Sequence, residues 1–250
     1  MINKKKIKIY SNSLKGNFRK TNQDSLAYGF DKNNNLIAIV CDGVGSIDGS
    51  EYASKFISNF FLKSFITNKH KSIKKWFIKI LDESIKQLKN IAIKKQKIDI
   101  STTLAILIIK NNYFYIFNIG DTRIYKISKN NKIYQLTYDH NFKNYLLKQN
   151  VINEILEINK SRWFSLTSFI DANNKKAANF YFTYKKLSFN SQFILCTDGV
   201  YNYISKKELL LILNNQKNIY IDKSKSLNKQ ALKNGSQDNV SNIIIEFEKN

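Results

Sequence analysis

Apolar residues along the chain follow two different spacings, one typical of strands and the other of helices. Short runs rich in β-branched and aromatic residues predict strands, and several of these runs have no polar face. Such strands are expected in sheets that other layers cover on both sides. Polar turns at 109–113 and 129–132 predict hairpins, so neighbouring strands should pair antiparallel. The predicted strands are Leu36–Cys41, Leu104–Ile109, Tyr113–Ile119, Phe193–Cys196 and Asn242–Phe247.

Two longer segments repeat apolar residues every three or four positions, which predicts amphipathic helices. One begins at Glu51 and the other at Ser72, and we interpret both apolar stripes as core-facing. Strands interleaved with amphipathic helices indicate a layered α+β fold. No repeat or Gly/Ser-rich linker divides the chain, so we predict that residues 1–250 form a single domain. Weaker helical patterns cover 144–158, 206–214 and 224–233.

The chain carries a formal net charge of +22, from 41 lysines and arginines against 19 acidic residues. This excess raises the alternative of a nucleic-acid-binding domain, since lysine and arginine patches release counterions from phosphate backbones. However, the lysines are scattered over predicted helix faces and loops, and no DNA- or RNA-binding motif accompanies them. We interpret them as a solvated basic surface with no specific nucleic-acid partner. Its positive field favours encounters with acidic or phosphorylated proteins.

The two cysteines, Cys41 and Cys196, lie inside apolar runs that are far apart in the sequence. This placement predicts reduced core thiols rather than a disulfide, and therefore a cytoplasmic protein. A cysteine nucleophile is not expected, because no arginine follows either cysteine at the spacing of a phosphate-cradling loop. The longest apolar runs have the length of strands and fall far short of the roughly 20 residues of a spanning helix, so no membrane anchor is expected.

Five aspartates at the ends of apolar runs are the strongest candidates for chemistry. A strand that ends in Asp-Gly brings a carboxylate to the rim of a sheet, where the glycine allows the backbone to turn sharply. Clustered carboxylates without histidine or cysteine ligands suit Mg²⁺ or Mn²⁺, because these ions prefer oxygen donors. The pattern therefore predicts a metal-dependent hydrolase. The five aspartates are Asp24, Asp42, Asp121, Asp198 and Asp238.

Seven short segments contain these aspartates or lie between them. They are Arg19 to Asp24, Asp42 to Ser46, Ser101 to Thr103, Gly120 to Arg123, Leu136 to His140, Thr197 to Gly199, and Asp238-Asn239. Taken in order, they resemble the signature segments of the metal-dependent serine/threonine phosphatases, the protein phosphatase 2C family. That family typically shows Arg-x-x-Asn-Glu-Asp, Asp-Gly-Met-Gly-Gly, a Gly-Ser-Thr strand, Gly-Asp-Ser-Arg, Leu-Thr-x-Asp-His, Thr-Asp-Gly and Asp-Asn. The resemblance covers nearly the whole chain.

The resemblance implies a fold, an activity and a metal site. The fold is a four-layer sandwich of two antiparallel β-sheets flanked by helix pairs. The activity is hydrolysis of phosphoserine and phosphothreonine on proteins by a metal-activated water. Two Mn²⁺ or Mg²⁺ ions are implied, with Asp42 bridging them and the Gly43 carbonyl as a second oxygen ligand. Asp198 and Asp238 would hold the first ion, and Asp121 would help to hold a third, weaker ion.

The resemblance also implies residues that act on the substrate. Arg19 would bind the substrate phosphate through its planar fork, and Asp24 would orient waters in the site, which makes both of them catalytic candidates. The implied partners are phosphorylated proteins, dephosphorylated in opposition to a serine/threonine kinase. We interpret His140 as structural rather than catalytic.

Several positions near the site depart from the family pattern, and two of them, Gln23 and Val44, bear directly on the chemistry. Gln23 stands where the family often has Glu, which removes one negative charge and is expected to lower metal affinity. Val44 replaces a Met or a His, so the leaving group would have to be protonated by water or by another group. These departures keep open the alternative of a weak or inactive pseudophosphatase that binds phosphoproteins. We expect an active enzyme, since all the principal metal aspartates remain.

Overall fold

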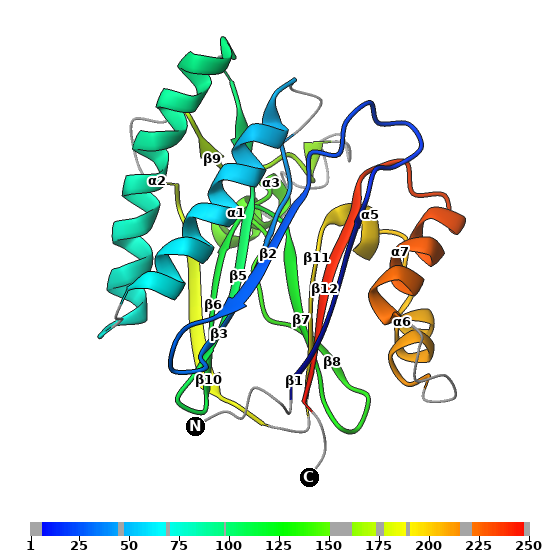
Figure 1. The fold of residues 1–250 in the computed structure, drawn as a ribbon. Helices are drawn as coiled ribbons and strands as arrows, with labels where there is room; N and C mark the ends of the chain where they lie inside the picture. The colour runs from blue at the N-terminus through cyan, green and yellow to red at the C-terminus, as the bar shows by residue number, and fades with distance from the viewer. Residues whose placement is uncertain are drawn as a thin grey trace.

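Two antiparallel β-sheets lie face to face between two layers of helices in the computed structural model (Figure 1). Helices α1 (Ser50–Thr67) and α2 (Ile73–Lys95) cover one sheet, and α6 (Lys206–Leu213) and α7 (Lys223–Lys233) cover the other. This arrangement confirms the predicted four-layer α+β sandwich. The structure describes residues 7–44, 48–68, 71–97, 99–150, 162–173, 178–188, 191–215 and 222–247.

Each large sheet has five strands, with the order β1-β12-β11-β7-β8 in one and β10-β6-β5-β3-β2 in the other. Neighbouring strands are antiparallel throughout both sheets. The strands of the first sheet are β1 (Ile7–Leu14), β7 (Arg123–Ile127), β8 (Ile133–Gln135), β11 (Gln192–Cys196) and β12 (Val240–Phe247). Those of the second are β2 (Ser25–Phe30), β3 (Leu36–Cys41), β5 (Leu104–Lys110), β6 (Tyr113–Ile119) and β10 (Tyr181–Lys186). A small third sheet pairs β4 (Ser101–Thr102) with β9 (Ile170–Asp171).

The central strands have no polar face because both of their faces are buried. On β3, Ala38 and Val40 pack between the two sheets, whereas Ile37 and Ile39 pack against α1 and α2. Strand β11 repeats this alternation on the other sheet, where Ile194 packs toward α6 and α7. Because side chains alternate between the two faces of a strand, each central strand contributes to the apolar layer between the sheets and to the layer under its helices.

The predicted strands and the two clear helices agree closely with the structure, whereas the helix predicted from residue 144 ends at Lys148, before a turn at 149–150. All five predicted strands are present, with ends that differ by at most two residues. Asn111 and Asn112 have φ of 51° and 60° and turn β5 into β6, and Asn131, with φ of 58°, lies in the β7–β8 turn. Helix α2 begins where Ser72 caps the backbone N–H of Lys75.

Sequence patterns missed several strands, and four of these, β1, β2, β8 and β10, lie at sheet edges. An edge strand has one strand neighbour and a half-exposed surface, so its apolar signal is diluted by polar residues. In the region 144–158, helix α3 (Phe142–Lys148) occupies the beginning, and residues 151–158 lie outside the described ranges. The short helix α5 (Asp198–Tyr201) was also missed.

The two cysteines are buried free thiols, as predicted. Cys41 belongs to the apolar layer under α1 and α2, and Cys196 to the layer under α6 and α7, so the two sheets separate them. Burial raises the pKa of both thiols, and the pKa of Cys196 reaches about 12. None of the described helices combines the length and apolar character that crossing a bilayer demands.

Candidate active site

The Asp42-Gly43 turn is held at the end of β3 by a short neighbouring segment. The Asp42 amide donates to the Thr103 side-chain hydroxyl (2.9 Å), and the Asp42 carbonyl accepts from the Thr103 amide (2.8 Å). Gly43 donates to the Gln23 carbonyl (3.1 Å), and a Cβ on Gly43 would lie 2.9 Å from that carbonyl oxygen. The backbones of Gly43 and Gln23 approach so closely that only glycine fits at position 43. This packing holds the backbone next to the Asp42 carboxylate in place.

The other carboxylates come from strand ends in both sheets. Asp121 follows β6 after Gly120, whose φ of 94° requires a residue without a side chain. Asp198 follows β11 at the start of α5, and Asp238 lies just before β12. They line a cavity of about 380 Å³. Six of the seven candidate residues line this cavity, namely Arg19, Asp42, Gly43, Asp121, Asp198 and Asp238.

These carboxylates are close enough to alter each other's ionisation. Burial, followed by the charges of Asp24 and Asp198, raises the pKa of Asp42 well above its usual range. Burial and Asp238 raise the pKa of Asp198. Burial and Asp198 raise the pKa of Asp121 to about 7. Crowded negative charges disfavour each other, and a bound cation would relieve this repulsion.

Arg19 lies beside these carboxylates and pairs with one of them. Its Nε donates to Asp238 Oδ1 (2.8 Å) and its Nη2 to Asp238 Oδ2 (2.6 Å). This hydrogen bonding, together with the charge of Asp238, raises the pKa of Arg19. The residue predicted to bind phosphate and a residue predicted to bind metal are thus joined in a two-point ion pair.

Asp24 differs from the other candidates because it is buried and does not line the cavity. Its Oδ2 accepts from the Thr197 hydroxyl (3.1 Å), and its buried Oδ1 has no hydrogen-bond partner among the described residues. Burial, with the charge of Asp198, raises the pKa of Asp24 to about 7. A buried carboxylate oxygen without a partner is costly, so this atom is suited to a water or a cation at the rear of the site.

The donor set suits a hard divalent cation, because the carboxylates that line the cavity offer oxygen atoms. Within the described ranges, however, no three acidic, histidine or cysteine side chains already converge as a metal-binding group. Both oxygens of Asp238 face Arg19. The cavity therefore has the oxygen ligands that a divalent cation prefers, but in this structure their side chains do not converge on one point.

Two residues of the signature segments support the site from behind. His140 Nδ1 accepts from the Gly120 amide (3.1 Å), and the His140 amide donates to the Gly120 carbonyl (2.9 Å). These bonds fit the structural role that was predicted for His140. The Arg123 guanidinium is bound to Asp139 (2.7 Å) and lies 3.8 Å from the Tyr201 ring centre. The Tyr201 hydroxyl in turn donates to Asp121 Oδ2 (3.4 Å).

Sequence reasoning missed the apolar side of the cavity. Phe164, Leu166 and Phe169 line it, and Phe164 is 65% exposed. These residues follow neither a helical nor a strand spacing, so no pattern in the sequence pointed to them. Thr103, which also lines the cavity, lies in one of the signature segments but had been assigned no role.

Comparisons with known proteins find related sequences over nearly the whole chain. The profile of the protein phosphatase 2C family matches residues 19–233. A protein of Mycoplasma genitalium named "Putative protein phosphatase" is 31% identical over 247 residues, which cover 95% of this chain and 94% of that protein. The serine/threonine phosphatase stp of Listeria welshimeri is 26% identical, with coverage of 93% and 92%.

Solved structures confirm the fold. The serine/threonine phosphatase Stp1 from Staphylococcus aureus superposes with a TM-score of 0.83 at 24% identity, covering 97% of this chain and 96% of that one. A serine/threonine phosphatase from S. agalactiae gives a TM-score of 0.85 at 19% identity, with coverage of 97% and 100%. At these identities the likeness concerns the fold alone.

Proposed function

The chain belongs to the protein phosphatase 2C family, and from this premise we propose that it hydrolyses phosphoserine and phosphothreonine on proteins with Mn²⁺ or Mg²⁺. The observation that carries the proposal is the gathering of four carboxylates and one arginine around a single cavity. Asp42, Asp121, Asp198 and Asp238 come from four different strand ends, and Arg19 lies beside them. A phosphate ester needs cations to neutralise its oxygens, and this set provides for both a metal and a guanidinium.

The carboxylates would hold two ions. Asp42 would contribute to both ions, with the Gly43 carbonyl as a second oxygen ligand. Asp198 and Asp238 would hold the first ion, and Asp121 would help to hold a third, weaker ion. When bound, the ions supply a water nucleophile near neutral pH and neutralise charge on the phosphoryl group. Burial and the repulsion between neighbouring carboxylates raise the pKa of Asp42 and Asp198, and a bound cation would relieve that repulsion, which favours ion binding.

Arg19 would exchange one anion for another during the reaction. Its side chain is 32% exposed, so it can turn from Asp238 toward a substrate phosphate without disturbing the core. The guanidinium fork that now bonds two carboxylate oxygens has the geometry to bond two phosphoryl oxygens. Release from Arg19 would leave Asp238 Oδ2 available for metal, while Oδ1 would still accept from the Asn239 amide (2.8 Å). We therefore propose that metal binding and substrate binding both draw Arg19 away from Asp238.

The side chains at positions 24 and 44 bear on how water and protons are handled in the site. Asp24 Oδ1 would accept a hydrogen bond from a water at the rear of the site, and its other oxygen stays held by Thr197. Val44 lines the cavity with an apolar side chain, and His140, the histidine within the described ranges, does not line it. The leaving alkoxide would accordingly take its proton from water rather than from a side chain at position 44.

We also propose that residues 1–250 form a single catalytic domain. Its partners would be phosphorylated proteins, and it would oppose a serine/threonine kinase in the cytoplasm. The family membership supports this assignment of substrate class, and the serine/threonine phosphatase relatives support the choice of residue type. The two buried free thiols are consistent with a reducing compartment.

Metal-dependent turnover tests the proposal. The purified protein should hydrolyse p-nitrophenyl phosphate and a phosphothreonine peptide with Mn²⁺ or Mg²⁺, and EDTA should abolish both activities. Activity that persists in excess EDTA would exclude the metal-dependent reaction. Binding of the phosphopeptide without turnover at any Mn²⁺ concentration would instead support the pseudophosphatase alternative, which Gln23 and the Arg19–Asp238 pair keep open.

A further inference from the structure

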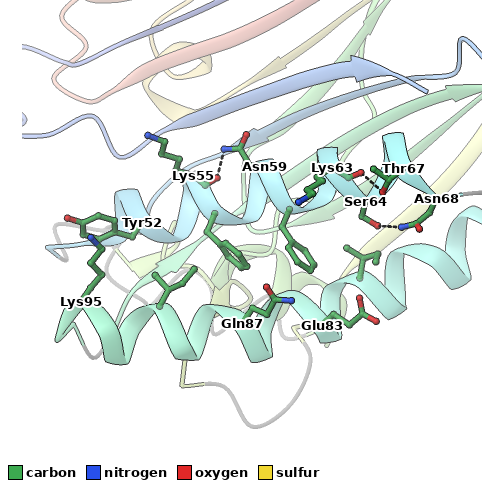
Figure 2. Close-up of a pocket in the computed structure, with 14 residues that line it drawn as sticks. Tyr52, Lys55, Asn59, Lys63, Ser64, Thr67, Asn68, Glu83, Gln87 and Lys95 are labelled. Atoms are coloured by element: carbon green, nitrogen blue, oxygen red, sulfur yellow. Dashed lines mark hydrogen bonds between the residues drawn. The ribbon is translucent and has the colours of Figure 1, made fainter. Parts of the chain in front are cut away.

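A second cavity, of about 870 Å³, forms a groove between α1 and α2 (Figure 2). The sheet-facing side of α1 is filled by fully buried residues such as Ile57 and Phe61. The groove lies along the next positions around the helix, where Lys55, Asn59 and Lys63 are exposed. It therefore opens on the outer layer of the sandwich and not into the core.

Contacts near both ends of the groove join the two helices. At one end the Lys95 ammonium lies 4.6 Å from the centre of the Tyr52 ring, and Figure 2 shows these two side chains next to each other. Toward the other end the Trp76 indole donates to the Ser64 hydroxyl (3.0 Å), which also accepts from the Asn68 side chain (3.1 Å). Between these contacts the groove remains open.

The floor of the groove is apolar. Phe56 and Phe60 project from α1 with ring centres 5.3 Å apart, and Ile91 projects from α2. All three are only partly buried against the core, so apolar surface faces the open groove. A partner that covered this surface would gain free energy in proportion to the apolar area removed from water.

The rim of the groove is mainly basic. Lys55, Lys63 and Lys95 are exposed on it, and within the described part of the chain none of the three forms an ion pair with a carboxylate. Glu83 is the acidic residue among the lining side chains, and it lies 3.7 Å from Lys79. Helix α2 as a whole contains seven lysines and two acidic residues. A basic rim of this kind is complementary in charge to an anionic ligand.

We infer that the groove binds an acidic amphipathic segment of a partner protein. An apolar floor between basic edges matches a helix with one apolar face flanked by Asp and Glu, the helix-in-groove mode of recognition. From Tyr52 to Asn68 the groove spans about 24 Å along α1, which fits a helix of about 16 residues. A flat anionic bilayer does not enter a concave groove, and a phosphate backbone does not use its apolar floor.

The groove and the acid-lined cavity have no lining residue in common. A partner bound between α1 and α2 therefore leaves the cavity open to a phosphoresidue. The inference concerns docking alone and holds whether or not the protein is a phosphatase.

A designed peptide of about 16 residues tests the inference. It carries leucines on one helical face, glutamates on both flanks and a fluorescein label, and its binding to the full-length protein is followed by fluorescence anisotropy. Lys55→Glu/Lys63→Glu, two exposed positions on the rim, should weaken binding by about tenfold or more. The matched control is Lys89→Glu/Lys229→Glu, with the same charge change at exposed positions outside the groove, and it should stay within about twofold of wild type.

Location and specificity are tested with the same proteins. Hydrogen–deuterium exchange should show protection by the peptide in 52–68 and 83–95. A scrambled peptide of equal composition should bind at least about tenfold more weakly, because its leucines no longer share a face. Equal loss of affinity in the rim and control variants would overturn the proposal. So would equal binding of the scrambled peptide, or tighter groove-dependent binding of single-stranded RNA or of phosphatidylglycerol vesicles.

Discussion

The acid-lined cavity and the groove between α1 and α2 are built in opposite ways. The cavity draws its carboxylates from strand ends of both sheets, and burial raises the pKa of Asp42, Asp121 and Asp198. The groove is made by two helices that are neighbours in the sequence, and its lysines remain exposed to water. Burying like charges costs free energy, whereas solvated lysines cost little. A site for chemistry thus depends on the whole fold, and a docking surface depends on one helix pair.

The largest expected effect concerns a carboxylate of the cavity. Asp198→Asn keeps the shape of the side chain but removes a negative charge that would bind metal, so kcat should fall by about a hundredfold or more. Steady-state hydrolysis of p-nitrophenyl phosphate at saturating Mn²⁺ measures this. Asp82→Asn, on the exposed surface of α2, is the matched control and should leave kcat unchanged. An unchanged rate for Asp198→Asn would exclude this residue from the site.

A smaller effect is expected at Arg19, which separates phosphate binding from metal binding. Arg19→Ala removes charge-assisted hydrogen bonds worth roughly 1.5 to 3 kcal/mol each, so kcat/KM should fall by about tenfold or more, mainly through KM. The same change frees Asp238 from its ion pair, so Mn²⁺ affinity measured by calorimetry should rise or stay constant. A variant with wild-type KM and kcat would show that Arg19 has no part in substrate binding.

The stability of the metal-free protein should depend on pH. The pKa values of Asp24 and Asp121 are raised to about 7 in the folded state, above their ordinary values near 4, so the folded state binds more protons between these limits. Stability should therefore decrease as pH rises from about 4 to about 7. In EDTA, the Tm at pH 5.5 should exceed the Tm at pH 7.5 by about 5 °C.

Saturating Mn²⁺ should reduce or reverse this difference in Tm, because ionised carboxylates are the ligands of the metal. Asp121→Asn should reduce the pH dependence in EDTA, since amides do not titrate. A metal-free protein that becomes more stable between pH 5.5 and pH 7.5 would contradict the crowding of carboxylates in the cavity.

The smallest catalytic effect is expected in the groove. Lys55→Glu/Lys63→Glu should leave kcat and KM for p-nitrophenyl phosphate within about twofold of wild type, because these lysines lie outside the cavity. A loss of activity toward this small substrate comparable to that of Asp198→Asn would show that the groove and the cavity are not independent.

Much of the fold followed from the sequence because the central strands are buried on both faces. Runs such as Leu36–Cys41 and Tyr113–Ile119 contain little that is compatible with exposure, and their bounds were predicted without error. Edge strands such as β1 and β10 were missed, because partial exposure admits serine, asparagine and lysine. The candidate residues were found through short segments whose order resembles a known family, and six of the seven line one cavity.

The sequence by itself determined which residues carry carboxylates at strand ends and which segments are core, since both depend on local composition and spacing. Only the tertiary structure decided that Asp24 is buried outside the lining of the cavity, that Arg19 pairs with Asp238 and that Phe164 forms part of the wall. Residues 219 positions apart form that ion pair, and no local pattern encodes such a contact. The open groove likewise arises from how two predicted helices pack, because a helical stripe specifies the buried face but not the space left beside it.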